Sequence, residues 1–316
     1  MGGCIRSETA RDETFETRRL ARVDAEYPAQ LREDADAPDV LYVRGAFASE
    51  DALAVAVVGS REPTEYGLSV AEDIAAELAA RGITVVSGLA RGIDGAAHRG
   101  ALRAGGRTIA VLGSGVDVIY PPEHRRLADD IVEHGALVSQ FPPGTAPRSV
   151  HFPVRNRVIA GMTLGVVVVE AAAKSGALIT ARLAAELGRE VMGVPGRVTS
   201  PASRGVHALI KDGAALVECA DDVVAALPAR WRECVTGASS AEPREGPLRH
   251  GAEVRGDNRL VLSAVGTEPV TIDDVIGRTG LGSGRAAAVL LELELAGRVR
   301  QIEGQRFVQI GMRGEN

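Results

Sequence analysis

Short apolar runs alternate with amphipathic stretches from residue 54 onward, and this alternation limits the possible folds more than any other feature of the chain. The apolar runs are almost continuous rather than interrupted by polar residues at every second position. Strands that are buried on both faces of a sheet have this pattern. We therefore predict buried strands at Ala54–Val58, Ile83–Val86, Thr108–Leu112, Ala136–Val138, Leu164–Val169 and Val191–Val194.

The stretches between these runs have the polar–apolar spacing of helices that cover one face of a sheet. Parallel strands need crossover connections, and these usually contain a helix and are right-handed. Repeated strand–helix units therefore predict an α/β fold with a doubly wound, mostly parallel sheet. The predicted helices are Leu68–Ala80, Asp94–Ala104, Glu123–Glu133, Leu178–Leu187 and Val206–Lys211.

Residues 52–228 make up the sheet region, and the segments before and after it have different patterns. Residues 1–20 are charged and are predicted to form a mobile tail. Residues 21–51 are predicted to form an extended lead-in with a short strand at Val40–Val43. Residues 229–256 mix proline, glycine and charge, which is typical of a flexible linker.

Residues 257–316 have the pattern of a small separate unit. Three helices followed by a two-stranded wing are typical of a winged-helix domain, and the second and third helices are joined by a short glycine-containing turn. The predicted elements are the helices Leu260–Val265, Ile272–Thr279 and Ser283–Ala296, and a hairpin of Val299–Ile302 and Arg306–Ile310 that turns at Glu303-Gly304.

Charge is distributed unevenly along the chain. The formal net charge is −6, but residues 145–211 contain 9 Lys and Arg against 3 Glu, whereas residues 1–51 contain 7 Arg against 12 Asp and Glu. A polyanion responds to the local field more than to the total charge. An anionic partner is therefore expected at the basic stretch of this acidic protein.

Metal, disulfide and membrane functions have little support in the sequence. Cys4, Cys219 and Cys234 are scattered, with no CxxC spacing and no His/Cys cluster, so we expect neither a disulfide framework nor a metal or cofactor site. The charged N-terminus lacks the apolar core of a signal peptide, and Leu164–Val169 is too short to span a bilayer. These features favour a cytoplasmic protein without a membrane anchor.

Glycine-rich loops follow the first three predicted strands, at Gly59–Gly67, Ser87–Asp94 and Gly113–Asp117. In a parallel sheet such loops lie at the carboxyl ends of the strands, where backbone N–H groups and helix N-termini bind anions. No GxGxxG opens a helix and no GxxxxGK[ST] occurs, so the loops carry no standard nucleotide fingerprint. A tight turn that binds nothing is the alternative for any single loop.

The basic stretch contains two segments with anion-binding character. Arg148 precedes Phe152, and Arg155-Asn156-Arg157 follows it. Arginine pairs with phosphate, and a phenyl ring stacks on a base. The alternative is an arginine-rich helix start that forms surface salt bridges. The second segment, Lys174-Ser175-Gly176, precedes a predicted helix and suits an anion.

Support for catalysis is weaker. The histidines are scattered without a Ser/His/Asp order, and Ser60, Ser87 and Ser175 have no convincing base. Glu170, at the end of a predicted strand, is either an acid/base group or a residue that orients Arg157, and we favour the orienting role. We therefore expect a protein that is not an enzyme.

At these positions the chain closely resembles the DNA-processing protein A (DprA, also called Smf) family. The matching motifs are ordered and correctly spaced over roughly residues 25–228. The chain departs from the family at Gln140 and His207, where glutamate and asparagine are usual. The motifs include Val58-Gly59-Ser60-Arg61, Ser87-Gly88-Leu89-Ala90-Arg91-Gly92-Ile93-Asp94, Phe152-Pro153-Val154-Arg155-Asn156-Arg157 and Ser175-Gly176-Ala177-Leu178-Ile179-Thr180.

The resemblance implies a Rossmann-like domain that binds single-stranded DNA, forms a homodimer and helps to load RecA recombinase during natural transformation. It also implies a winged-helix accessory domain at the C-terminus. The DNA-binding positions of the family, carried over to this chain, are Gly59, Ser60, Arg61, Arg148, Phe152, Arg155, Asn156, Arg157, Lys174, Ser175 and Gly176.

Two other functions stay open. Related Rossmann-like folds include hydrolases that release a base from a nucleoside monophosphate, and Glu170 near Ser175-Gly176 could take the place of their glutamate. Their PGGxGT loop is missing, because Lys174-Ser175-Gly176 stands at that position. The second alternative is a transcriptional regulator that binds duplex DNA through residues 257–316.

Overall fold

The computed structural model describes residues 16–236, 256–265, 269–295, 298–302 and 306–309. The chain divides into two compact units, Met1–Ala241 and Glu242–Asn316, which are described separately below. Within the described ranges, no helix is both long and apolar enough to cross a membrane.

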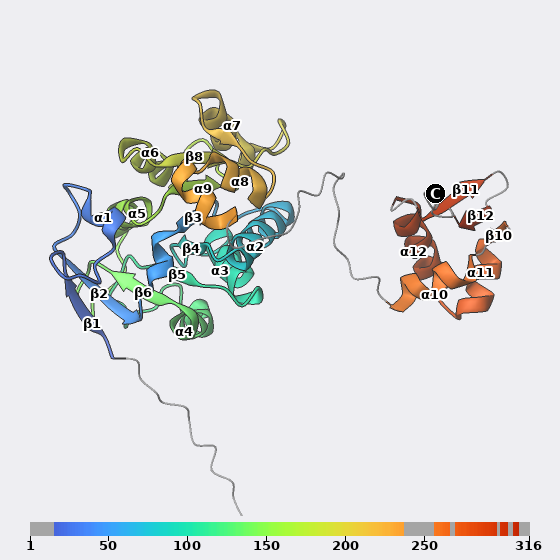
Figure 1. Ribbon diagram of the computed structural model, residues 1–316, viewed down its shortest axis with the longest axis horizontal. Helices are drawn as coiled ribbons and strands as arrows, with labels where there is room; N and C mark the ends of the chain where they lie inside the picture. The colour runs from blue at the N-terminus through green and yellow to red at the C-terminus, as the bar shows by residue number, and fades with distance from the viewer. Residues whose placement is uncertain (1–15, 237–255, 266–268, 296–297, 303–305, 310–316) are drawn as a thin grey trace, which may run out of the picture. The chain divides into compact units, whose positions relative to one another are not determined.

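The described strands of the first unit form one sheet, in the order β1-β2-β6-β5-β4-β3-β7-β8-β9 (Figure 1). All neighbours from β6 to β9 pair in parallel, which confirms the predicted doubly wound, mostly parallel sheet. The six predicted buried strands are β3 Ala54–Val58, β4 Thr84–Ser87, β5 Thr108–Val111, β6 Ala136–Ser139, β7 Gly165–Val168 and β8 Glu190–Gly193, and β9 Ala215–Leu216 follows them.

The lead-in segment is part of this sheet rather than an extended approach to it. Strand β2 (Val40–Gly45) pairs antiparallel with β6, and β1 (Arg18–Ala21) pairs antiparallel with β2. Helix α1 (Ala29–Arg32) lies between them in the chain. The predicted tail is therefore wrong for residues 18–20, because edge pairing orders them; residues 1–15 lie outside the described residues.

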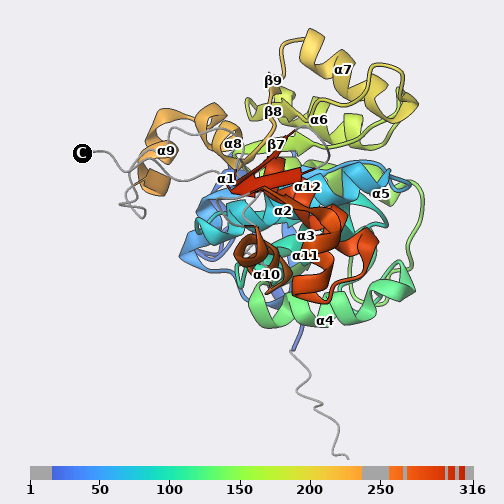
Figure 2. The ribbon, with the colours of Figure 1, turned by 90° about the vertical axis from the view of Figure 1, so that its right-hand side faces the viewer.

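Helices cover both faces of the sheet (Figures 1 and 2). One face packs against α1, α5, α6 and α7, and the other against α2, α3, α4 and α8. Helix α4 lies at the end of the sheet opposite to α6 and α7. The helices are α2 Glu65–Ala80, α3 Ile93–Arg103, α4 Arg125–His134, α5 His151–Gly161, α6 Ala177–Glu186, α7 Arg204–Lys211 and α8 Ala220–Ala226.

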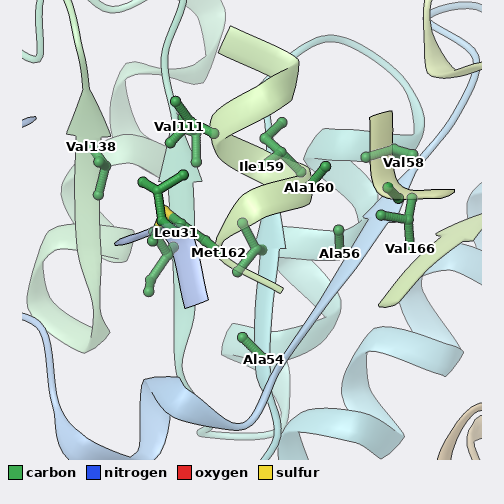
Figure 3. Close-up of a cluster of buried hydrophobic side chains, with 14 of the residues drawn as sticks. Leu31, Ala54, Ala56, Val58, Val111, Val138, Ile159, Ala160, Met162 and Val166 are labelled. Atoms are coloured by element: carbon green, nitrogen blue, oxygen red, sulfur yellow. The ribbon is translucent and has the colours of Figure 1, made fainter. Parts of the chain in front are cut away.

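The core on the α5 face is built from small and branched apolar side chains. Figure 3 shows Ile159 and Ala160 of α5 in the same buried cluster as Ala56 of β3 and Val111 of β5. These four side chains are no more than 1% exposed. Aromatic residues make up only 3% of the chain, so α5 lies close to the sheet. This close packing brings the polar start of α5 to the carboxyl ends of the strands.

The predicted linker begins with a helix. Residues Ala229–Thr236 form α9, whose Trp231 packs against the cluster that contains α8. The prediction of a flexible segment is therefore wrong for 229–236, because the partly buried tryptophan ties the helix to the first unit. Residues 237–255 lie outside the described residues.

The second unit has the predicted winged-helix elements around its own core. At the start of α11 the Thr271 hydroxyl accepts from the backbone N–H of Asp274, and the Asp274 side chain accepts from the backbone N–H of Thr271. Gly280 ends α11 in the left-handed conformation, as a short turn between two helices requires. The short strand β10, which joins the wing as a third strand, was not predicted. The predicted wing turn Glu303-Gly304 lies outside the described residues. The elements are α10 Gly256–Ala264, β10 Val270–Thr271, α11 Ile272–Thr279, α12 Ser283–Leu295, β11 Val299–Ile302 and β12 Arg306–Gln309.

Candidate nucleic-acid interface

The winding direction of the sheet reverses between β3 and β7. After β3 the chain continues to β4, β5 and β6 on one side, and after β7 it continues to β8 and β9 on the other. The loops that leave the two strands therefore diverge, and a crevice opens at their carboxyl ends. A cleft of about 530 Å³ lies at this point.

Three predicted groups of residues meet in the cleft. Gly59, Ser60 and Arg61 follow β3; Phe152, Arg155 and Asn156 come from the first turns of α5; and Lys174, Ser175 and Gly176 precede α6. These groups are about 20 to 110 residues apart in the sequence. The structure thus brings together nearly all of the positions that the resemblance implied.

The Gly59–Arg61 loop is held from two sides. Glu170 accepts hydrogen bonds from the backbone N–H of Thr64, at 2.8 Å, and from the Thr64 hydroxyl, at 2.7 Å. A Cβ on Gly59 would lie 2.6 Å from Cγ1 of Ile93 and 2.9 Å from the carbonyl oxygen of Glu170. Only glycine therefore lets the loop pass between α3 and the end of β7.

The position of Glu170 corrects one expectation and weakens an alternative. Its carboxylate is 3% exposed and binds Thr64 at the start of α2, so the predicted role of orienting Arg157 is wrong. Glu170 is also absent from the residues that line the cleft. A hydrolase would need this glutamate free beside its substrate.

Arg155 is an internal brace rather than a free cation. It is 4% exposed, and its Nη1 donates to the carbonyl oxygens of Gly88, at 2.6 Å, and Val111. These carbonyls end β4 and β5, so Arg155 joins α5 to both strands. Burial lowers the pKa of Arg155 to about 10, against the opposing effect of the Asp94 carboxylate.

Phe152 forms the aromatic wall of the cleft. The Arg61 guanidinium lies 4.9 Å from the centre of its ring, and the centre of the Tyr120 ring lies 6.2 Å from it. Arg61 is exposed and Phe152 is half-buried. A cation stacked on a phenyl ring beside open solvent is an arrangement that can accept a flat aromatic ligand.

The start of α6 also lines the cleft. The Ser175 hydroxyl accepts from the backbone N–H of Ala177 at 3.3 Å, and Lys174 is exposed beside it. The first-turn N–H groups of Ala177, Leu178 and Ile179 already have acceptors, so it is the helix dipole that favours an anion at this end. The Lys174 ammonium adds a full positive charge.

Two predicted residues do not face the cleft. Arg157 points to the lead-in segment, where its Nε and Nη2 each lie 2.7 Å from an oxygen of Asp34, and Nη2 also pairs with Asp36. These hydrogen bonds raise the pKa of Arg157 and lower that of Asp34. Arg148 is exposed before α5 and does not line the cleft.

Sequence reasoning missed one important residue of the cleft. Asp94, in the first turn of α3, lines the cleft and is 7% exposed. It was noted only as the end of a glycine-rich loop, and an acid was not expected among phosphate-binding groups. In the part of the chain that the structure describes, no three His, Cys, Asp or Glu side chains gather in a way that could hold a metal ion.

Comparison with known proteins gives the family directly. Residues 18–228 match the family model of DNA recombination-mediator protein A, and residues 245–305 match that of the DprA winged helix domain. The chain is 42% identical to Protein Smf of Escherichia coli over 289 residues, which is 90% of this chain and 76% of that protein. It is 43% identical to DNA processing protein DprA of Bacillus subtilis over 206 residues, 65% of this chain and 69% of that protein.

Two solved structures are similar to this one. One is DprA from Streptococcus pneumoniae, with 43% identity and a TM-score of 0.64 over 68% of this chain and 76% of that chain. The other describes a single-stranded DNA binding mode of DprA from Helicobacter pylori, with 28% identity and a TM-score of 0.59 over 66% of this chain and 94% of that chain. On the two family models, the sequence identities and the fold, the chain belongs to the DprA/Smf family of DNA recombination mediators, with a C-terminal winged-helix domain.

Proposed function

We propose that the cleft between β3 and β7 binds single-stranded DNA, and that the protein protects incoming DNA and loads RecA recombinase during natural transformation. The observation that carries the proposal is the meeting of Arg61, Phe152 and the α6 N-terminus around one open cleft.

The chemistry of the cleft suits an unpaired strand better than a duplex. Arg61 and Lys174 can neutralise phosphates, the dipole of α6 favours an anion beside them, and Phe152 offers a ring face on which a base can stack. In a duplex the base faces are covered by their neighbours, so a base can reach Phe152 only from single-stranded DNA.

The wider role rests on the family. The homologue from Helicobacter pylori is described with single-stranded DNA, and this supports the same ligand here. RecA as a partner and a homodimer as the active form are proposed from the same resemblance. A cytoplasmic location is proposed from the scattered cysteines and the charged N-terminus. A mediator of this kind positions DNA and protein and needs no catalytic group, in keeping with the family description.

A salt series tests the proposal. Affinity for a fluorescent oligothymidine and for a duplex of equal length is measured by anisotropy at increasing salt. Each phosphate contact contributes about 0.7 to the slope of log affinity against log salt for single strands. We expect tighter binding of the single strand, and a slope smaller by about 0.7 for both Arg61→Ala and Lys174→Ala.

Arg126→Ala serves as the matched control, because Arg126 is an exposed arginine on α4 that does not line the cleft. Its slope is expected to equal that of the wild type. Equal slopes for all three variants, or tighter binding of the duplex, would contradict the proposed site.

A further inference from the structure

A carboxylate lies in the floor of a cleft that is otherwise built for anions. Asp94 is 7% exposed, and its Oδ2 accepts from the backbone N–H of Ala90 at a long 3.4 Å. The Ser87 hydroxyl is a second polar neighbour of this carboxyl group. Both oxygens thus keep acceptor capacity. A phosphate beside this carboxylate is disfavoured by like charge, so the group that binds here must bring hydrogen-bond donors.

Asp94 is a buried carboxyl group beside the Arg155 guanidinium. Burial raises its pKa, and the neighbouring Arg155 guanidinium acts in the opposite direction. Arg155 is already bound to the carbonyls of Gly88 and Val111, so its positive charge is nearby while its Nη1 is occupied. A ligand with N–H groups would complete the hydrogen bonding of the carboxylate.

Asn156 supplies the complementary group on the same floor. Its Oδ1 accepts from Nε of Arg155 at 3.2 Å, and its Nδ2 donates to the Gly176 carbonyl at 3.4 Å. This pattern assigns the amide orientation and leaves the second hydrogen of Nδ2 available. Phe152 lines the same cleft and provides the stacking face. The floor therefore offers acceptors at Asp94 and one donor at Asn156.

We propose that Asp94 reads the edge of an unpaired base and makes guanine the preferred base in the cleft. Guanine carries two adjacent donors, N1–H and the N2 amino group, which match the two carboxylate oxygens, and its O6 beside N1 can accept from Asn156. Adenine and cytosine place a bare ring nitrogen beside their amino group, and thymine places carbonyl oxygens on both sides of its N–H. A carboxylate repels all of these acceptors.

This inference rests on the proposed single-stranded DNA binding and adds base selectivity to it. The test uses oligothymidines of about ten nucleotides in which one central base is G, A, C or T. We expect the G-containing strand to bind about tenfold more tightly than the all-thymidine strand, as is typical of a bidentate base contact. The full-length protein is used throughout.

Asp94→Asn provides the decisive variant, because it replaces one acceptor with a donor at unchanged size. The preference for guanine is expected to disappear, and strands with C or A should gain, since an amide matches an amino group beside a ring acceptor. Asp34→Asn is the control, because Asp34 is a similarly buried aspartate (5% exposed) that does not line the cleft. This variant shows the effect of a lost buried carboxylate on stability, and its base preference is expected to equal that of the wild type.

The outcomes separate the two proposals. Absence of binding to every oligonucleotide would overturn both the single-stranded DNA site and the guanine preference. Equal binding of all four strands by the wild type would overturn the guanine preference alone, whether or not Asp94→Asn folds. If Asp94→Asn binds every strand more weakly but still prefers guanine, Asp94 has only a structural role. That result would also overturn the proposal that Asp94 selects the base.

Discussion

Three arginines within or near the cleft have the same side-chain chemistry but lie in three different environments. Arg61 lies exposed over Phe152, Arg155 is buried against the carbonyls that end two strands, and Arg157 is paired with Asp34. In the sequence all three have the pattern of phosphate contacts. The difference comes from which carbonyl or carboxylate the folded chain places beside each guanidinium, and spacing along the chain does not contain that information.

His98 is a buried titratable residue that the proposed function does not use. The Thr108 hydroxyl donates to the Val85 carbonyl, so Nδ1 of His98 must donate to Thr108, and Nε2 is left buried without a partner. Burial lowers the pKa of His98 to about 3, from a usual value of 6.5. The folded protein therefore holds this imidazole neutral.

The depressed pKa of His98 predicts a loss of stability in mild acid. Below pH 6.5 the unfolded chain takes up a proton at this residue and the folded chain does not, so stability is complete above pH 6.5 and falls as the pH decreases. The loss at pH 5 is about 2 kcal/mol. In urea unfolding at pH 7.5 and 5, His98→Leu should lack this part of the decrease.

A matched histidine variant completes that experiment. His134 is exposed at the end of α4, so His134→Gln removes one histidine without touching the core. It should lose as much stability between the two pH values as the wild type. Wild type and His98→Leu with the same pH dependence would show that His98 is not held neutral by the fold.

At the scale of elements, strands buried on both faces were easier to predict than edge elements. Strands β3 and β5 are continuous apolar runs, and their predicted bounds agree with the structure to within one residue. Strand β1 begins with two arginines, and only its pairing with β2 makes it a strand. Helix α5 contains Pro153 and two arginines. From the sequence, a helix start here was only the alternative to a phosphate-binding segment. Neighbours distant in sequence decide such elements.

The loop after β3 gives a prediction at the element scale. Gly59→Ala places a methyl against Ile93 and the Glu170 carbonyl, and the backbone oxygen cannot move aside without shifting β7. We expect a loss of about 1–3 kcal/mol in unfolding free energy. Because the shifted loop carries Ser60 and Arg61, the affinity for single-stranded DNA should fall as well.

Gly176→Ala is the control for this substitution. No atom lies within 4 Å of the added Cβ, and the residue has ordinary φ and ψ values of −62° and −24°. Its unfolding free energy should stay within about 0.5 kcal/mol of the wild type in the same urea titration. Equal stability of both alanine variants would contradict the prediction, because it would mean that the loop can accept a methyl group at Gly59 despite the close contacts.

At the scale of the whole molecule, the sequence predicted the two units and the position of the cleft but not how the lead-in joins the sheet. Glycine loops at strand ends and a basic stretch were enough to locate the cleft, because parallel strands place their carboxyl ends at one edge. Asp94 was missed because its local sequence does not show that it lies near Arg155, which reaches the ends of β4 and β5 from α5. The ion pair between Arg157 and Asp34 was missed for a similar reason, since it spans 123 residues.

That ion pair predicts how the lead-in segment is held to the first unit. The Asp34 side chain is 3% exposed, and it loses both of its 2.7 Å hydrogen bonds in Arg157→Ala. We expect a cost of about 2–3 kcal/mol in urea unfolding at pH 7, between the values for exposed and fully buried pairs. The hydrogen bond from Arg157 lowers the pKa of Asp34, so this cost should shrink as the pH falls through the depressed pKa.

The same variant decides whether Arg157 also contacts DNA. If it serves only the ion pair, Arg157→Ala and Asp34→Asn should show strong coupling in a double-mutant cycle of unfolding free energies, because each removes the same interaction. The slope of DNA affinity against salt should then stay at the wild-type value. A slope smaller by about 0.7 in Arg157→Ala, with no coupling to Asp34, would instead place Arg157 among the phosphate contacts that the family resemblance implied.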